Sequence, residues 1–326
     1  MKKIIFISMM SLLLVLVTAC GPKDVASSNT TNETSNKQKV AKEDAVLSLT
    51  DMAGRTVHFT KKPERIITLT NSDMGIVYAL GGSVVGRQTM DASGVEPSAA
   101  LKATEVGNTH DLNLEKIASL TPDVIVASSE QNLKDVPALE SIGAQVVLTG
   151  ANSIADIKKQ EAILAQLLGK DATKLQQEID TKVAEIKQEQ KGKAVRALLI
   201  LGAPGSNYAA LPNSLSGDIL EKAGGVNVAK DFKGVENFPQ YASLNIEKIV
   251  QADPEVIFLM IHGGDEKETE IAFQKEMKQN DAWNSTTAVN NNNIVVLPAD
   301  LFGTNPGIRI TKALDFMANE LNQVQK

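Results

Sequence analysis

Several residue types that build common functional sites are scarce in this chain of 326 residues. It contains one Cys, three His, one Trp and three Tyr, and aromatic residues make up 4% of the sequence. A single Cys excludes an internal disulfide and a zinc site built from cysteines. So few aromatic side chains also argue against a broad platform for stacking bases or sugars.

The charge balance argues against a further class of partner. The chain has 33 Lys and Arg against 39 Asp and Glu, which gives a formal net charge of −6. Nucleic-acid-binding domains usually carry a basic face, so we expect no nucleic-acid partner. A hydrophobic fraction of 43% and a charged fraction of 22% are ordinary for a globular protein. The length allows two domains that each bury a core.

The first segment has the pattern of an exported lipoprotein. Two lysines precede an apolar stretch over residues 4–17 that is too short to span a membrane as a stable helix. The sequence Val-Thr-Ala-Cys, which ends at Cys20, matches the lipobox of bacterial lipoproteins. We therefore predict a signal peptide over residues 1–19 and acylation of Cys20, palmitate included, which anchors the chain at the outer face of the cell membrane. The alternative is an ordinary signal peptide followed by an incidental Cys.

A polar segment separates this anchor from the body of the chain. Residues 20–44 are rich in Ser, Thr, Asn and Lys and nearly free of large apolar side chains. Such a segment buries too little surface to offset its ordering entropy, so we predict a flexible tether. The body begins at about residue 45 with a predicted β-hairpin over residues 46–59.

Beyond the hairpin, short apolar runs alternate with helical stretches. Residues 153–191 have the periodicity of two successive helices, and the second carries one apolar stripe. The predicted buried strands are 65–70, 124–127, 145–148, 197–201, 256–261 and 294–297. This alternation predicts an α/β fold.

An internal repeat divides the body into two similar halves. Residues 113–128 (NLEKIASLTPDVIVAS) align without gaps on residues 245–260 (NIEKIVQADPEVIFLM), with seven of sixteen positions identical. Each copy has the pattern of a short helix, a Pro turn and a buried strand. A chance match is the alternative, because helix–Pro–strand units share composition.

The repeat predicts two Rossmann-like α/β lobes joined by one long helix. We place the N-terminal lobe at residues 45–168, the interlobe helix at 169–193 and the C-terminal lobe at 194–326. Ligands of α/β proteins usually bind at the carboxyl ends of the strands, so we expect the site in the cleft between the lobes.

These features together resemble the substrate-binding lipoproteins of ABC importers for iron chelates, haem and cobalamin. The matching motifs are the lipobox at Cys20, the DMAGR segment at 51–55 with PERII at 63–67, and the paired N-[LI]-E-K-I units. The resemblance covers about residues 45–326. It implies a monomeric, non-enzymatic protein that binds ligand between two lobes and delivers it to a permease dimer.

The resemblance also implies a docking surface. In that family one surface Glu of each lobe contacts arginines of the permease, and these positions correspond to Glu115 and Glu247. Each lies in the first turn of a repeat helix, so a two-fold partner suits the pair. The alternative is that both are first-turn residues favoured by the helix dipole.

The three histidines differ in their positions. His58 alternates between Val57 and Phe59 in the predicted hairpin, which indicates a solvent-facing strand residue. His110 lies in a loop before the first repeat helix, and His262 directly follows the strand at 256–261. Under the strand-end rule the last two face the cleft, one from each lobe.

Further segments resemble the haem-binding branch of the family. The IHGG segment at 261–264 implies His262 as the axial ligand from the C-terminal lobe. The corresponding N-terminal ligand of better-known members is a Met, and this chain has His110 there. We therefore predict haem iron held between His110 and His262, with Met90 and Met260 as alternative sixth ligands.

Further residues are candidates for the rest of the predicted pocket. Candidate apolar walls are Tyr78, Tyr208 and Phe302, although each is equally well placed in a core. Candidate partners of the haem propionates are Asn71, Ser72, Ser206, Asn207 and the backbone of Gly205.

Three other functions fit the sequence less well than haem binding. A ferric-siderophore binder needs cationic or aromatic cleft groups, for which only Arg87 and Arg309 are suitable arginines. Direct Zn²⁺ or Mn²⁺ binding requires three or four converging ligands. An enzyme is disfavoured because the chain has no phosphate loop, no GxSxG motif and no thiol beyond Cys20.

Overall fold

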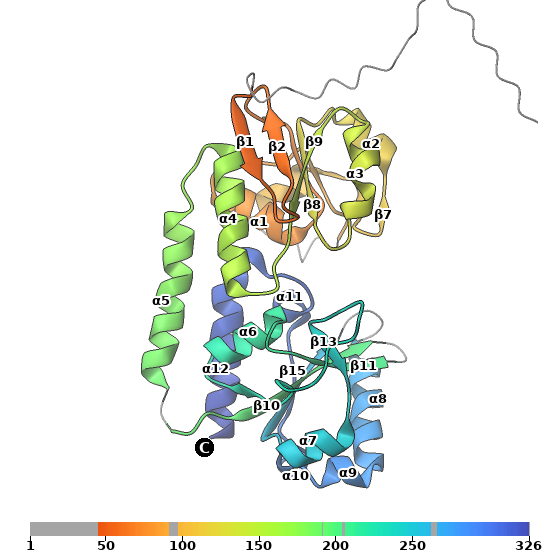
Figure 1. The fold of residues 1–326 in the computed structure, drawn as a ribbon, viewed down its shortest axis with the longest axis vertical. Coiled ribbons are helices and arrows are strands. Elements are labelled where there is room, and N and C mark those ends of the chain that lie inside the picture. The colour runs from red at the N-terminus through yellow and green to blue at the C-terminus, as the bar shows by residue number, and fades with distance from the viewer. Residues whose placement is uncertain (1–44, 91–96, 191, 204–205, 262–265, 326) are drawn as a thin grey trace, which may run out of the picture. The chain divides into compact units, whose positions relative to one another are not determined.

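The computed structural model describes residues 45–90, 97–190, 192–203, 206–261 and 266–325 (Figure 1). The predicted signal peptide, Cys20, the tether and His262 lie outside the described residues.

The N-terminal lobe is built on a parallel sheet in the order β5-β4-β3-β8-β9. Its strands are β3 (Ile66–Thr68), β4 (Gly86–Arg87), β5 (Thr104–Glu105), β8 (Val124–Ser128) and β9 (Gln145–Thr149). Its helices are α1 (Asn71–Ala79), α2 (Leu114–Ser119), α3 (Val136–Glu140) and α4 (Ile154–Leu168). The apolar side chains of the short runs that predicted these central strands are buried, as expected for a parallel sheet covered on both faces.

Two antiparallel hairpins flank this sheet. β1 (Leu47–Thr50) pairs with β2 (Thr56–Phe59), which confirms the predicted hairpin and places His58 opposite Ser48. The His58 Nδ1 and Ser48 Oγ atoms are 2.7 Å apart. A second, shorter hairpin joins β6 (Gly107–Asn108) to β7 (Asp111–Leu112), and its turn carries His110.

The C-terminal lobe has a mixed sheet in the order β13-β11-β10-β14-β15, with β12 also paired to β10. Its strands are β10 (Arg196–Ala203), β11 (Ser206–Ala210), β12 (Val226–Asn227), β13 (Tyr241–Ser243), β14 (Val256–Ile261) and β15 (Ile294–Val296). Its helices are α6 (Leu215–Lys222), α7 (Ile246–Ala252), α8 (Glu266–Gln279), α9 (Asp281–Asn284), α10 (Thr287–Asn290), α11 (Ala299–Phe302) and α12 (Ile310–Val324). The antiparallel strands β11 and β13 were not predicted.

Two long helices lie between the two sheets in the sequence: α4, which belongs to the N-terminal lobe, and then α5 (Thr173–Glu189). Helix α5 runs beside α12, to which Lys182 is linked by an ion pair with Asp315 at 3.0 Å (Figure 1). Ile179 and Ile186 of its predicted apolar stripe are buried in the core of the C-terminal lobe. The structure therefore confirms the predicted fold class.

The internal repeat is present in the backbone as well as in the sequence. Asn113 and Asn245 cap α2 and α7 in the same way, because each side chain accepts a hydrogen bond of 2.9 Å from the backbone N–H three residues later. Both helices are followed by a residue in the left-handed region, Thr121 with φ 42° and Asp253 with φ 45°.

The carboxylates that follow these turns also have matching roles. Asp123 accepts a hydrogen bond of 2.9 Å from the backbone N–H of Arg65, just before β3. Glu255 accepts one of 2.9 Å from the backbone N–H of Arg196, at the start of β10. Each repeat thus fixes the start of a central strand in its lobe, and the two lobes share this unit.

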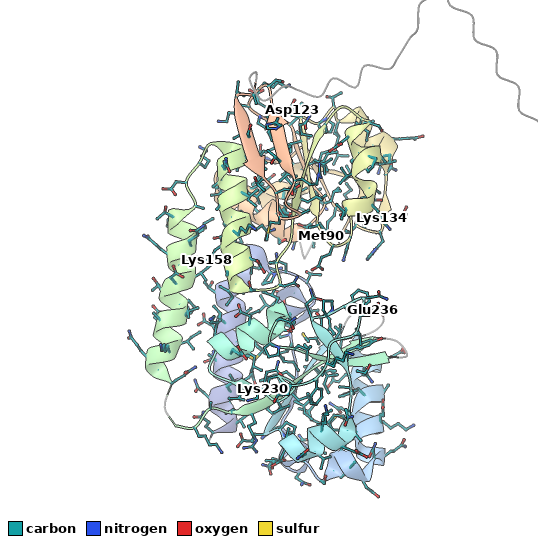
Figure 2. All side chains as sticks on the ribbon, in the orientation of Figure 1. Met90, Asp123, Lys134, Lys158, Lys230 and Glu236 are labelled. Atoms are coloured by element: carbon teal, nitrogen blue, oxygen red, sulfur yellow. The ribbon has the colours of Figure 1, made fainter. Side chains whose placement is uncertain are left out.

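Helix α4 contains a carboxyl group with an unusual environment. Glu161 is 1% exposed, and its Oε2 has no hydrogen-bond partner among the described residues. Lys158, one turn earlier, pairs with Asp180 of α5 at 2.7 Å (Figure 2). Burial raises the pKa of Glu161, and this effect is larger than the opposite effect of the Lys158 charge. The pKa of Glu161 is therefore about 7.

This environment predicts a pH-dependent stability. The unfolded chain releases the Glu161 proton near pH 4.5, whereas the folded chain keeps it up to about pH 7. The folded state therefore binds more protons between these values, and the free energy of unfolding falls as the pH rises through them. We expect Glu161→Gln to stabilise the protein more at pH 8 than at pH 5 in urea denaturation. The exposed Glu189→Gln serves as the control, and an equal effect of Glu161→Gln at both pH values contradicts the assignment.

Candidate functional site

A cavity of about 570 Å³ lies between the two lobes, within the size range of small-molecule sites. On the N-terminal side it is bounded by the residues that follow three parallel strands, which agrees with the strand-end rule. These residues are almost all polar: Thr70, Asn71 and Ser72 after β3, Ser128 at the end of β8 with Glu130 and Gln131 after it, and Thr149 at the end of β9 with Gly150 and Asn152 after it.

The C-terminal wall is largely apolar. Tyr208, Leu201 and Met260 stand side by side on β11, β10 and β14, because Leu201 is in register with both of the others. Leu301 and Phe302 of α11 extend the same wall. Phe238, which is 63% exposed, and Tyr241 of the edge strand β13 also line the cavity. The cavity is thus polar on one side and apolar on the other.

Two helices begin at the cavity, one from each lobe. Thr70 caps α1 by accepting a hydrogen bond of 3.2 Å from the backbone N–H of Asp73. Ser214 caps α6 by accepting one of 3.0 Å from Gly217. The free N–H groups of a first helical turn attract negative charge. Ser72 and Ser216, the second residue of each helix, both line the cavity.

His110 reaches the cavity from a short, firmly held hairpin. The Asn108 Oδ1 atom accepts hydrogen bonds of 2.9 Å from the backbone N–H groups of His110 and Asp111, which closes the turn. Thr109 donates its hydroxyl to the carbonyl of Leu69 at 3.2 Å. The backbone is therefore fixed, while the imidazole of His110 is exposed and lines the cavity.

The side chain of Asn132 holds this hairpin through hydrogen bonds. It is fully buried, and its Nδ2 donates to the Thr109 carbonyl at 3.1 Å and to Asp135 at 3.0 Å. Its Oδ1 accepts a hydrogen bond of 3.2 Å from the backbone N–H of Ser128, at the end of β8. Asn132 thus ties the turn that carries His110 to the central sheet.

Several of the predicted pocket residues come together in this cavity. Those that line it are Asn71, Ser72, His110, Tyr208, Met260 and Phe302. Gly205, the side chain of Ser206 and His262 lie outside what the structure describes.

Two predicted pocket residues lie elsewhere. Tyr78 is in the last turn of α1, about 10 Å along the helix from the cavity end at Asn71, and packs against the core of the N-terminal lobe. Asn207 is adjacent to Tyr208 on β11, and neighbouring strand residues point to opposite faces of a sheet. Neither Tyr78 nor Asn207 is among the described residues that line the cavity.

Other side chains considered from the sequence do not line the cavity. Met90 is half-buried and packs against the core of the N-terminal lobe (labelled in Figure 2). Arg87 forms an ion pair of 2.8 Å with Glu105, and Arg309 forms one of 3.0 Å with Asp300. Both arginines are thus neutralised within their own lobes.

Buried polar contacts join the two walls. The Gln160 side chain of α4 donates its Nε2 to Asp73 at 2.6 Å and accepts a hydrogen bond of 2.9 Å from Asn305 of the C-terminal lobe. Thr149 also donates to Asp73, at 2.8 Å. Burial raises the pKa of Asp73, while its hydrogen bonds from Thr70, Gln160 and Thr149 act in the opposite direction.

Sequence reasoning missed part of the site. Glu130 and Asn152 lie in the loops that follow β8 and β9, so the strand-end rule could have found them. Phe238 and Tyr241 come from a loop and an edge strand of the C-terminal lobe that carry no such signal.

The two predicted docking residues lie on exposed helices. Glu115 is in the first turn of α2 and Glu247 in the first turn of α7, and both side chains are exposed.

Among the residues that the structure describes, no helix has the length and apolarity needed to cross a membrane. That same part of the chain contains no group of three or more His, Cys, Asp or Glu side chains arranged to hold a metal ion.

The sequence matches known proteins. A family model described as periplasmic binding protein matches residues 66–301. The chain is also 29% identical over 216 residues to the high-affinity heme uptake system protein IsdE of Staphylococcus aureus. The aligned region covers 64% of this chain and 71% of that protein.

Solved structures match over most of the chain. An ABC transporter substrate-binding protein from Listeria monocytogenes has a TM-score of 0.68 at 26% identity, covering 81% of this chain and 100% of that one. S. aureus IsdE complexed with heme has a TM-score of 0.65 at 25% identity, covering 79% and 98%. S. aureus SirA complexed with staphyloferrin B has 0.69 at 24%, covering 84% and 98%.

The hydrogen bonds by which Asn132 holds the His110 hairpin give a testable prediction. Asn132→Ala leaves the Thr109 carbonyl and the Ser128 N–H without this partner in a buried site, which costs about 1–3 kcal/mol for such groups. We expect a loss of unfolding free energy of that size in urea denaturation. The control is Lys134→Ala, an exposed residue two positions later (Figure 2), which should change little. Equal stability of the two variants contradicts the role given to Asn132.

Proposed function

Because the chain belongs to the periplasmic binding protein family, we propose that it captures haem between its lobes and delivers it to an ABC permease for iron acquisition. Proteins of this kind are the substrate-binding components of ABC importers. They work outside the cytoplasm, hand a ligand to a permease and are not enzymes.

The observation that carries the proposal is the imidazole of His110 at a cavity with an apolar opposite wall. Haem is a flat, largely apolar ring with an iron centre, and imidazole is a common axial ligand of that iron. Tyr208, Leu201 and Met260 form a continuous apolar surface against which such a ring packs. The similarity to IsdE, which binds heme in its solved structure, supports the same ligand class.

We propose that His262 supplies the second axial ligand. It follows Met260 by two positions in the sequence, and Met260 lines the cavity. Ligation by two neutral imidazoles favours ferric haem more than ligation by Met and His does, because a thioether raises the reduction potential. Met260 is the alternative ligand from the same wall, since its side chain already lines the cavity.

The propionates are assigned to the polar wall. Asn71 and Ser72 open α1 at the cavity, where the helix N-terminus favours negative charge. Ser216 at the start of α6 offers a similar position in the other lobe.

A ferric siderophore is the second candidate ligand. The polar N-terminal wall favours it, since a hydrogen-bonding chelate needs such partners, and SirA of the same fold binds staphyloferrin B. Against it, none of the described residues that line the cavity is Lys or Arg.

Anchoring and docking complete the proposal. Cys20 is the proposed acylation site, residues 20–44 the tether, and Glu115 and Glu247 the proposed contacts to the permease. Their exposed positions in matching first turns of α2 and α7 support a two-fold symmetric partner.

Haemin titration of the mature chain, residues 20–326, tests the ligand. We expect a saturable Soret band at one haemin per chain. His110→Ala and His262→Ala should each weaken binding at least about tenfold, by loss of an iron–nitrogen bond. His58→Ala is the matched control, because His58 lies in the β1–β2 hairpin and does not line the cavity. The absence of any spectral change at stoichiometric haemin refutes haem binding.

Transport separates docking from binding. We expect the Glu115→Ala/Glu247→Ala double variant to lose haem uptake in cells while its haemin titration stays unchanged, since neither side chain lines the cavity. An exposed pair away from the repeat helices, Glu189→Ala/Glu221→Ala, should retain uptake. Normal uptake by the first double variant contradicts the docking assignment.

A further inference from the structure

One carboxylate stands at the cavity without a neutralising cation. Glu130 follows β8 on the N-terminal wall and is exposed to solvent. It is the sole Asp or Glu among the described lining residues, none of which is Lys or Arg. Arg87 and Arg309, the arginines that the sequence offered for the cleft, are each paired with another acid.

The position of this carboxylate is fixed. The Asn152 Nδ2 atom, which follows β9, donates a hydrogen bond of 2.8 Å to Glu130 Oε1. The side chain is therefore held by a neutral neighbour that leaves its charge intact. Both residues line the cavity, so the charge faces the space that a ligand occupies.

The charge of Glu130 acts on Tyr241, which lines the cavity from the other lobe. Tyr241 belongs to β13 of the C-terminal lobe and lines the opposite side. Burial raises the pKa of its hydroxyl, and the negative charge of Glu130 raises it further. A second carboxylate, Glu236 (Figure 2), lies between Val235 and Phe238, which both line the cavity.

We propose that Glu130 is a specificity-determining residue that excludes multiply charged anionic ferric chelates from the cavity. Haem has only two carboxylates, which are assigned to the helix N-termini, and an apolar ring for the other wall. A polycarboxylate iron complex spreads several negative charges over its whole surface and cannot avoid Glu130. This inference rests on the proposed function, because it explains how one cavity admits haem and rejects a chelate of similar size.

Two ligands and a graded series of variants test the role of Glu130. The mature chain and its Glu130→Gln and Glu130→Lys variants are titrated with haemin, and with radiolabelled ferric citrate in equilibrium dialysis. The titrations run at pH 8, where an ordinary imidazole is neutral. Gln keeps the acceptor for Asn152, so the change is one of charge. The matched control is Glu64→Gln, an exposed residue ahead of β3 at the opposite end of the sheet.

We expect Glu130→Gln to bind ferric citrate about tenfold more tightly than the wild type at low salt, and Glu130→Lys more tightly still. The difference should vanish at high salt, because an exposed charge is screened. Haemin binding should change only a few-fold, and Glu64→Gln should behave as wild type.

Equal binding of ferric citrate by all variants overturns the role of Glu130. The haemin titration of the wild type then still tests the proposed function separately. A gain that persists at high salt also overturns it, since it points to a change of shape. Failure of the wild type to bind haemin refutes the proposed function, whereas the comparison of variants with ferric citrate still tests Glu130.

Discussion

The buried contact between Asp73, Gln160 and Asn305 fixes the relative position of the two cavity walls. Gln160 donates to Asp73 in the first turn of α1 and accepts from Asn305, which precedes α12, so one amide side chain links both lobes. Close packing supports it: α1 lies against η5 (Gly307–Arg309), where a Cβ at position 307 would come within 3.0 Å of the Ser72 backbone. Breaking such a network leaves a buried carboxyl without its partners, which is costly.

With the walls held, the cavity has two chemically different sides. The N-terminal side collects polar residues from strand ends and a helix start, whereas strands β10, β11 and β14 supply an apolar surface. A ligand that is apolar over most of its area and anionic at one edge matches both sides. The absence of lysine and arginine from the described lining makes helix N-termini the source of positive potential.

The sequence predicted most of the fold because its signals were local. Strand 256–261 was predicted with the bounds of β14, and Asn113 and Asn245 marked the helix starts that the structure shows. β11 (SNYAA) was missed because it lacks an apolar alternation, and because its other partner, β13, is distant from it in the sequence.

The site was predicted in part for a similar reason. Strand ends and helix starts identified His110, Asn71 and Ser72, but position along a helix decides whether a side chain reaches the cavity, and Tyr78 is seven residues too far along α1. Glu130 looked like any exposed loop carboxylate. Only its contact with Asn152 and its closeness to Tyr241 distinguish it, and both depend on the folded chain.

The most direct measurement is electron paramagnetic resonance of the ferric haem complex, made with and without isotopically labelled histidine. Ligation by His110 and His262 predicts a low-spin spectrum whose hyperfine couplings show two histidine nitrogens bound to iron. A high-spin spectrum, or a low-spin one with fewer than two histidine nitrogens, contradicts ligation by His110 and His262.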